Sequence, residues 1–272
     1  MLGQQGVLSP VFQIFLGQPQ KLQQLCVFSI HWLSIAGPRT LSSPHAAGEQ
    51  QEGKGRLVTL HTGMNDPKQS ELSMKAMNVA RDFPVVCVGG SAGGLDAYIR
   101  LLRHLPADMG VAVVIVNHLR TVATLLHEIL PRHTGMPVEL ITERLLIQPN
   151  RVFIIPGQRD LHMLDGEFRL KPISKPRGWP DVITVFLRSL TLHWGGKLIA
   201  VIVSGYDGDG AAALCAIKEV GGITIAQKLD TAGQPDMPES AIASGCIDFV
   251  LSPEDIAQEI IRIARAAQAK GT

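Results

Sequence analysis

Aromatic side chains are scarce in this 272-residue sequence, and neither sign of charge is in excess. Aromatic residues make up 5% of the chain, and 25 Lys and Arg residues nearly balance 24 Asp and Glu residues. There is thus no global field of the kind that draws a protein to nucleic acid or to an anionic membrane, and no basic tract interleaved with aromatics. We therefore expect no nucleic-acid partner.

Cysteine is also rare: Cys26, Cys87, Cys215 and Cys246 are widely spaced and form no C-x-x-C pair. This spacing argues against a zinc site and against a disulfide framework, and it is typical of proteins in a reducing cytoplasm. Cys87 lies inside a strand pattern, which indicates a small core residue rather than a nucleophile. We expect a cytoplasmic protein that needs no metal or other cofactor.

A long apolar run is missing as well. The best candidate, residues 25–37, is too short and too interrupted for a membrane-spanning helix of roughly 20 apolar residues. The segment before it carries a single lysine, which is atypical of a secretion signal. Residues 1–80 hold ten of the 16 glutamines without sustained periodicity, and residues 42–55 have the composition of a linker. We predict a poorly ordered extension over 1–80, a folded domain over 81–272, and no membrane insertion.

Apolar strand patterns alternate with helical patterns from residue 83 onward. Strands are predicted at 85–88, 111–116, 138–141, 152–155, 198–203, 223–226 and 247–251. Helices are predicted after residue 94, at 123–130, 181–193 and 210–220, and after a Ser252 cap, with a hairpin turn at 164–167. Such alternation is typical of a parallel sheet covered on both faces. We predict an α/β fold: a three-layer, mostly parallel, doubly wound (Rossmann-like) sheet with helices on both faces and a β-hairpin excursion.

The strand at 85–88 ends in a glycine-flanked serine, Ser91, just before a helical pattern. This places a hydroxyl beside the unpaired N–H groups of a helix N-terminus, which can hold a developing oxyanion. Residues 89–93 fit the nucleophile motif G-x-S-x-G. They fit neither G-x-G-x-x-G nor a P-loop. A phosphate-cradling loop and an ordinary tight turn remain alternatives to a serine nucleophile.

Two further strands also end in residues that an activated serine needs. His118 follows the strand at 111–116, and Asp209 follows the strand at 198–203. Sites of open parallel sheets form outside the carboxyl ends of the strands. A histidine base takes the proton of the serine, and a carboxylate fixes the tautomer of the imidazole. Each residue alone has an ordinary structural explanation, but together they indicate a hydrolase. The chain order Ser–His–Asp disfavours the α/β-hydrolase fold, which orders its triad Ser–Asp–His.

Several separated motifs carry a resemblance to a known family. They are residues 88–94 (VGGSAGG), 116–119 (VNHL), 155–157 (IPG) followed by His162, 203–211 (VSGYDGDGA) and 237–242 (MPESAI). In this order and spacing, the sequence resembles the catalytic domain of the chemotaxis protein-glutamate methylesterase family, CheB, over roughly residues 83–260.

The resemblance implies a reaction and a role for each site residue. Ser91 would be the nucleophile, His118 the general base and acid, and Asp209 the orienting carboxylate. The substrate would be a glutamate γ-methyl ester on a methyl-accepting chemoreceptor, with release of methanol. Receptor glutamines would be deamidated through the same intermediate. A methyltransferase or a response regulator would be a further partner. Backbone N–H groups near Ala92 and Tyr206 are our candidates for oxyanion donors.

The sequence departs from the family pattern at three places. Asp207 and Asp236 stand where the family commonly has glycine, and residues 179–184 keep the family's R-P-S-x-D pattern poorly. Asp207 is thereby a competing partner for His118. Residues 1–80 are too short for a receiver domain, so we expect no activation by phosphorylation in cis. The alternatives to an esterase are a catalytically weak relative that acts as a regulatory binding module, and a glycine-loop phosphate or nucleotide binder.

Overall fold

A computed structural model of the chain describes residues 83–118, 125–175, 179–195 and 197–269. The predicted extension over residues 1–80 and its apolar segment lie outside these residues, so the domain boundary at residue 80 stays a prediction. The first part of the helix predicted at 123–130 also lies outside them. Within the described ranges, no helix is long and apolar enough to span a bilayer.

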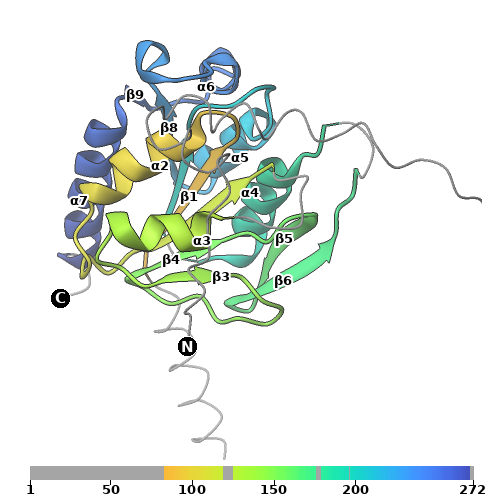
Figure 1. Ribbon diagram of the computed structural model, residues 1–272, viewed down its shortest axis with the longest axis vertical. Coiled ribbons are helices and arrows are strands. Elements are labelled where there is room, and N and C mark those ends of the chain that lie inside the picture. Colours follow the sequence, from red (N-terminus) through yellow and green to blue (C-terminus); the bar gives the residue numbers. More distant parts are fainter. Residues whose placement is uncertain (1–82, 119–124, 176–178, 196, 270–272) are drawn as a thin grey trace, which may run out of the picture. The chain divides into compact units, whose positions relative to one another are not determined.

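Seven parallel strands form the central sheet, in the order β3-β4-β2-β1-β7-β8-β9 (Figure 1). Their bounds are Val85–Gly90 (β1), Ala112–Asn117 (β2), Val138–Leu140 (β3), Arg151–Ile154 (β4), Leu198–Ile202 (β7), Ile223–Gln227 (β8) and Phe249–Leu251 (β9). The predicted hairpin is a separate two-stranded sheet of β5 (Arg159–Leu164) and β6 (Glu167–Pro172). Its turn residues, Asp165 and Gly166, have the positive φ values of 53° and 76° that tight hairpin turns require.

Helices cover both faces of the sheet, which confirms the predicted fold class. They are α2 (Gly94–Arg103), α3 (Leu126–Ile129), α4 (Val182–His193), α5 (Leu214–Glu219), α6 (Asp236–Ala243) and α7 (Pro253–Gln268), with short 3-10 turns at Leu130–His133, Ala211–Ala213 and Leu229–Thr231. The helix α7 begins as predicted, because the Ser252 hydroxyl accepts a hydrogen bond from the N–H of Asp255. The sequence did not predict α6.

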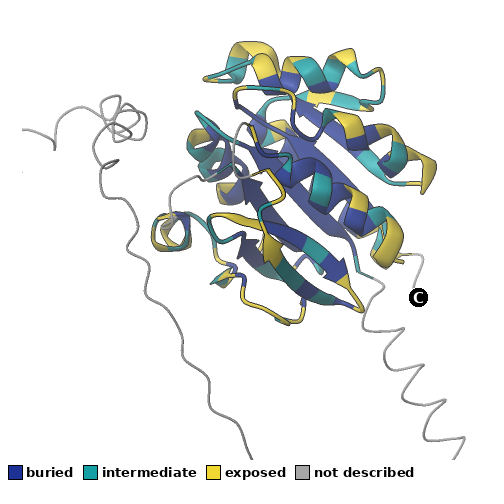
Figure 2. Cartoon of the chain, turned by 90° about the vertical axis from the view of Figure 1, so that its right-hand side faces the viewer, coloured by how far each residue is buried: buried dark blue, intermediate teal, exposed yellow. Residues whose placement is uncertain are grey.

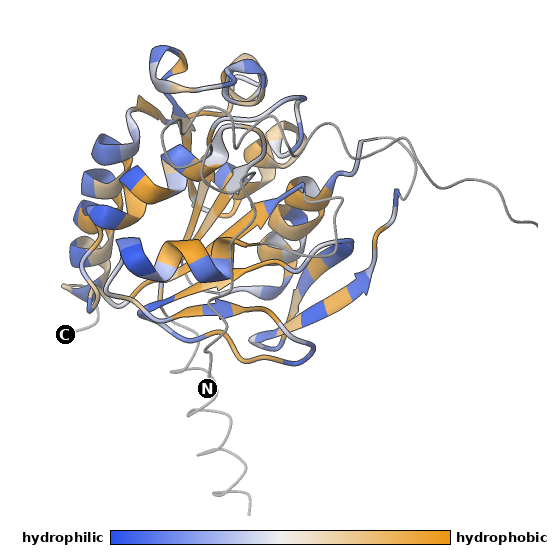
Figure 3. Ribbon diagram, viewed as in Figure 1, coloured by the Kyte–Doolittle hydropathy of each residue, from blue (hydrophilic) through white to orange (hydrophobic). Residues whose placement is uncertain are grey.

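Alternate residues along the strands point into two hydrophobic cores, one on each face of the sheet. Val85 and Cys87 of β1 point toward α4, α5 and the hairpin, whereas Val86 and Val88 point toward α2 and α7. Figure 2 shows the sheet buried between helices whose outer surfaces are exposed, and Figure 3 shows its strands as the most hydrophobic layer. Each fully buried Val or Leu side chain contributes about 1.5–3 kcal/mol. Cys87 is a buried free thiol, so its interpretation as a core residue is confirmed.

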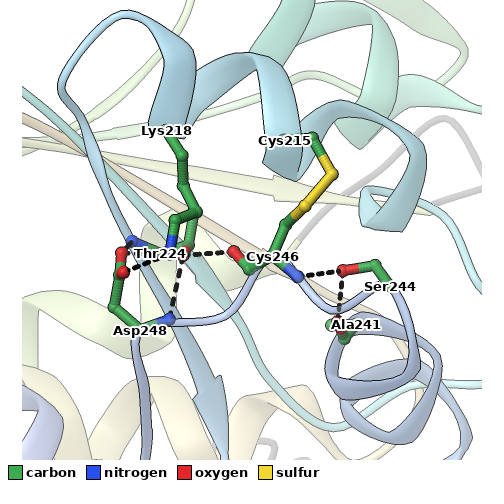
Figure 4. The surroundings of a disulfide bond; sticks show 7 residues. All are labelled: Cys215, Lys218, Thr224, Ala241, Ser244, Cys246 and Asp248. Atoms are coloured by element: carbon green, nitrogen blue, oxygen red, sulfur yellow. Dashed lines mark hydrogen bonds and ion pairs between the residues drawn. A yellow bond between two sulfur atoms is a disulfide. The ribbon is translucent and has the colours of Figure 1, made fainter.

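The other two cysteines within the described ranges contradict a prediction. Cys215 on α5 and Cys246, between α6 and β9, form a disulfide with a Cα–Cα distance of 5.1 Å (Figure 4). A separation of 31 residues gave no sign of this contact, because only the packing of α5 beside the chain that follows α6 creates it. The sequence argument against a disulfide framework was therefore wrong for these two cysteines. The cysteines no longer argue for a reducing compartment.

Candidate active site

The site lies at the carboxyl edge of three neighbouring strands, β2, β1 and β7. Gly90 of β1 is in register with Asn117 of β2. Ser91 and His118 are the next residues along these two strands, so they leave the sheet at the same level. The loop that follows β7 carries Asp209. The strand order thus brings the ends that carry the three predicted residues to one edge of the sheet, as parallel strands require.

Ser91 occupies the tight turn between β1 and α2. Its N–H donates to the carbonyl oxygen of Ser204 at 2.9 Å, and its own carbonyl accepts from the N–H of Gly94 at 3.0 Å. Gly93 precedes the helix with a φ of 74°, which favours glycine. The Ser91 hydroxyl makes no hydrogen bond to any other described residue. It lies beside the N-terminus of a ten-residue helix.

Asp209 is held by the first turn of α4. One carboxylate oxygen accepts from the N–H of Ile183 at 2.8 Å, and the other accepts from the N–H of Thr184 at 2.9 Å. These N–H groups have no partner inside the helix, and the helix N-terminus carries partial positive charge. The Thr184 hydroxyl in turn accepts from the N–H of Gly210. The carboxylate is therefore fixed in position and stabilised in its charged form.

His118 lies between two carboxylates. Its Nε2 is 2.6 Å from Oδ2 of Asp209, and its Nδ1 is 3.3 Å from Oδ2 of Asp207. The side chains of His118 and Asp209 are almost fully buried, and that of Asp207 is 19% exposed. The structure therefore joins the predicted base to the predicted acid. It also places the predicted competitor, Asp207, at the other ring nitrogen.

The two carboxylates shift the titration of the imidazole. Burial alone would lower the pKa of His118, but the hydrogen bond of Asp209 and the charges of Asp207 and Asp209 outweigh burial and raise this pKa from 6.5 to about 9. Burial would likewise raise the pKa of Asp209, but its bonds to His118 and Thr184 lower it below the ordinary 3.8. In this arrangement His118 is an imidazolium at neutral pH and Asp209 is ionised.

The two aspartates that replace family glycines behave differently. Asp207 has a φ of 71°, so it adopts the left-handed backbone that favours glycine and that aspartate tolerates. Asp236 is instead the first residue of α6, with no positive φ. An acidic residue there is favourable to the helix dipole. Asp207 thus has a backbone conformation that suits glycine, and its side chain enters the site.

Ser204 connects the loops around Ser91, and the sequence did not identify it as a site residue. Its buried hydroxyl donates to the carbonyl of Ala92 at 2.8 Å and accepts from the N–H of Gln234 at 2.8 Å. Its N–H donates to the side chain of Gln227 at the end of β8. A serine between a buried strand and a glycine was the only available signal. Such a hydroxyl fixes the ends of β1, β7 and β8 relative to one another.

The Met-Pro motif at the start of α6 packs against the loop that follows β7. Met237 is fully buried, and its N–H donates to the carbonyl of Gly205 at 3.0 Å. A Cβ at Gly205 would lie 2.7 Å from the Met237 side chain and 3.0 Å from Cβ of Ser91. The loop therefore passes Ser91 at a distance that only glycine allows. His162, from another of the quoted motifs, lies on β5 of the hairpin.

A pocket of about 250 Å³ adjoins the two aspartates. Its lining combines the start of α4 with the loop after β7: Trp179, Pro180, Asp181, Thr184, Arg188, Asp207, Gly208, Asp209 and Ala212. Asp207 therefore faces both His118 and this pocket.

Comparison with known proteins decides the family. Residues 86–260 match the family described as CheB methylesterase. The chain belongs to the CheB methylesterase family. The resemblance that the five motifs indicated is thus confirmed, and the match includes Ser91, His118 and Asp209.

Individual CheB relatives support this assignment. The chain is 34% identical over 185 residues to protein-glutamate methylesterase/protein-glutamine glutaminase 4 of Burkholderia thailandensis, covering 67% of this chain and 54% of the relative. It is 32% identical over 186 residues to a protein of the same description, numbered 2, of Burkholderia pseudomallei, with the same coverage. The chain thus spans about half the length of these curated relatives.

A solved CheB structure has the same fold. The crystal structure of the Thermotoga maritima CheB methylesterase catalytic domain matches with a TM-score of 0.61 and 27% sequence identity. The match covers 66% of this chain and 97% of that structure. The described part of the chain therefore corresponds to a CheB catalytic domain.

Proposed function

We propose that this chain is a serine esterase that hydrolyses glutamate γ-methyl esters on chemoreceptors and releases methanol. The observation that carries the proposal is the 2.6 Å pair of His118 and Asp209, at the strand ends that also carry Ser91. The names of the curated relatives support both the esterase and a glutaminase activity on receptor glutamines.

The proposed reaction begins with attack by the Ser91 oxygen on the γ-carbonyl carbon of the ester. His118, oriented by Asp209, takes the serine proton and returns it to the departing methoxide, which leaves as methanol. Water then adds to the acyl-enzyme, again with His118 as base, and glutamate and free Ser91 are restored. With a receptor glutamine as substrate, ammonia leaves in place of methanol.

We propose the backbone N–H groups of Ala92 and Tyr206 as donors to the oxyanion. Neither N–H donates a hydrogen bond to another described residue. Ala92 directly follows Ser91 at the N-terminus of α2, and Tyr206 follows Gly205, which lies against Ser91. Two such donors stabilise the charge that develops as the serine attacks.

The proposed partners follow from the same substrate. A methyl-accepting chemoreceptor is the protein substrate, and a methyltransferase or a response regulator is a further partner. We place the reaction in the cytoplasm on the family resemblance alone, because the Cys215–Cys246 disulfide has removed the argument from cysteine spacing.

Two alternatives predict different behaviour. A regulatory binding module would bind receptor without turnover, and a phosphate binder would use the glycine turn before α2. The buried His118–Asp209 pair favours the esterase, because neither alternative needs a carboxylate fixed on an imidazole.

The test is release of methanol from chemoreceptor carrying radiolabelled methyl esters. Wild-type protein should release label, Ser91→Ala should lose essentially all of it, and Asp209→Asn should lose a factor of about 10⁴ as in other triads. Receptor binding should persist in Ser91→Ala.

Failure of the wild-type protein to release methanol, while it is folded and a reference CheB enzyme releases methanol from the same receptor, would exclude this substrate. Unchanged release by Ser91→Ala would exclude Ser91 as the nucleophile.

A further inference from the structure

Both ring nitrogens of His118 face carboxylates, and neither is hydrogen-bonded to Ser91. Nε2 pairs with Asp209 at 2.6 Å, and Nδ1 lies 3.3 Å from Asp207. A histidine that serves a serine nucleophile needs one nitrogen for the orienting acid and the other for the hydroxyl. Because Asp209 pairs with Nε2, Nδ1 is the nitrogen left for Ser91, and Asp207 lies at this nitrogen.

We propose that Asp207 is a positioning residue that restrains His118 between two carboxylates, so that the base must leave Asp207 before it can take the proton of Ser91. The inference rests on the proposed function, whose base is the same imidazole. It concerns a side chain of this sequence, because the family commonly has glycine at this position.

The local backbone holds Asp207 in place. Its φ of 71° belongs to the left-handed region. Its Oδ1 accepts the N–H of Asp209 at 2.8 Å, so the side chain closes a turn on its own loop. Its other oxygen, Oδ2, is buried and makes no hydrogen bond in the described part of the chain, although it lies within ion-pair distance of His118. The carboxylate is thus fixed at one oxygen and directed toward the imidazole at the other.

The charged groups near this contact are few. Arg188 of α4 and Asp181, the residue before α4, line the pocket that Asp207 faces, and Asp181 forms an ion pair with Lys175. On the sheet side, the Cys87 thiol of β1 stays neutral, because burial and then the charge of Asp209 raise its pKa. The described groups that act on the His118 charge are therefore the two carboxylates.

The arrangement predicts an alkaline activity profile. With a pKa of about 9, His118 is largely protonated at pH 7, and only the small neutral fraction can act as a base. Loss of the Asp207 charge lowers this pKa, since an opposite charge within about 4–6 Å typically shifts a pKa by 1–3 units. Each unit increases the neutral fraction at pH 7 about tenfold.

Two substitutions distinguish the effect of the Asp207 charge from the effect of the turn that its side chain closes. Asp207→Asn removes the charge but keeps an oxygen for the N–H of Asp209, and asparagine tolerates positive φ. Asp207→Gly removes the side chain and suits the backbone. Asp165→Asn is the matched control, because Asp165 also has positive φ but lies in the hairpin turn.

The first measurement is an NMR pH titration of the His118 ring, identified by its absence in His118→Gln. We expect the wild-type ring to titrate near pH 9. The pKa of the ring should be lower by at least about one unit in both Asp207 variants and unchanged in Asp165→Asn. The second is the pH profile of kcat/KM for a p-nitrophenyl ester. In both Asp207 variants, we expect the acid limb of this profile to move to lower pH together with the pKa of His118. The value of kcat/KM at pH 7 should rise by about fivefold or more.

Either of two results would overturn the proposal: a His118 titration that is the same in wild type and Asp207→Asn, or a lowered titration accompanied by a loss of activity at pH 7. The second result would make Asp207 an orienting acid. The NMR titration needs no substrate. A protein without esterase activity would therefore contradict the proposed function, and the titration would still decide whether Asp207 restrains His118.

Discussion

At the scale of single residues, the charges of the site converge on His118. Its imidazolium is surrounded by Asp207 and Asp209, and the helix α4 holds Asp209 by two N–H groups. Buried charges of opposite sign stabilise a fold only while both are ionised. The stability of the domain should therefore depend on pH through this group.

The sign of this dependence follows from the two pKa shifts. The raised pKa of His118 stabilises the fold fully below about pH 6.5, and this contribution is lost as the pH rises toward about 9. The lowered pKa of Asp209 stabilises the fold above about pH 3.8, and this contribution is lost as the pH falls through the folded value. We expect the free energy of unfolding of the wild type to fall by up to roughly 3 kcal/mol between pH 6.5 and 9 relative to His118→Gln. Urea denaturation across this range measures it, and parallel curves for the two proteins would contradict the charged pair.

The sequence predicted the roles of residues that directly follow a strand. Ser91 and His118 come directly after buried strands, so their place at the edge of the sheet follows from chain direction. The sequence also marked Asp207 as a competitor of Asp209. It did not reveal that both carboxylates reach the same imidazole, because that depends on the φ of 71° at Asp207. Ser204 was missed because a buried hydroxyl between loops has no periodic signal.

At the scale of elements, the loop after β7 is fitted between β1 and α6. Gly205 is the residue of closest approach, with the Met237 side chain on one side and Ser91 on the other. Protein interiors transmit such small displacements, because they are closely packed. The position of Ser91 should therefore depend on the absence of a side chain at 205.

We predict that Gly205→Ala displaces Ser91 and Met237. The added methyl group should lower kcat for ester hydrolysis by at least about tenfold and cost about 1–3 kcal/mol in the free energy of unfolding, as overpacking does. Gly195→Ala is the matched control, since a Cβ there meets nothing within 4 Å. Equal activity of the two variants in a steady-state assay would show that the loop does not position Ser91.

The disulfide joins two elements that the sequence leaves unrelated. Crosslinking Cys215 to Cys246 closes a loop of 31 residues, for which chain entropy gives about 3–4 kcal/mol of stabilisation. We predict that Cys215→Ser lowers the free energy of unfolding by about this amount. Dithiothreitol should lower the stability of the wild type to that of the variant and leave the variant unchanged. A variant as stable as the oxidised wild type would contradict a stabilising crosslink.

Elements were predictable where periodicity alone specifies them. The apolar strands, the Asp-Gly hairpin turn and the Ser252 cap are local signals, and the structure contains all of them. The helix α6 was missed because its eight residues include a proline and have no strong apolar stripe. Burial of Met237 and Ala241 against the rest of the domain stabilises it instead.

At the scale of the whole molecule, the order of the strands creates the site. The layers follow from alternation of strands and helices, but adjacency of β2, β1 and β7 is a property of the assembled sheet. The sequence did not predict this order. The contact between Cys215 and Cys246 also arises at this scale, which is why their spacing suggested the wrong conclusion. We propose that residues 81–272 form the catalytic domain and that residues 1–80 are an extension outside it.

The central claim is that Ser91 carries the acyl group during ester hydrolysis. The most direct test is rapid acid quenching of the wild-type protein with methyl-esterified receptor peptide, followed by proteolysis and mass spectrometry. The account predicts a glutamyl ester of the receptor peptide on the fragment that contains Ser91, formed during methanol release and absent in Ser91→Ala. Methanol release with the acyl group on another residue, or release that persists in Ser91→Ala, would contradict it.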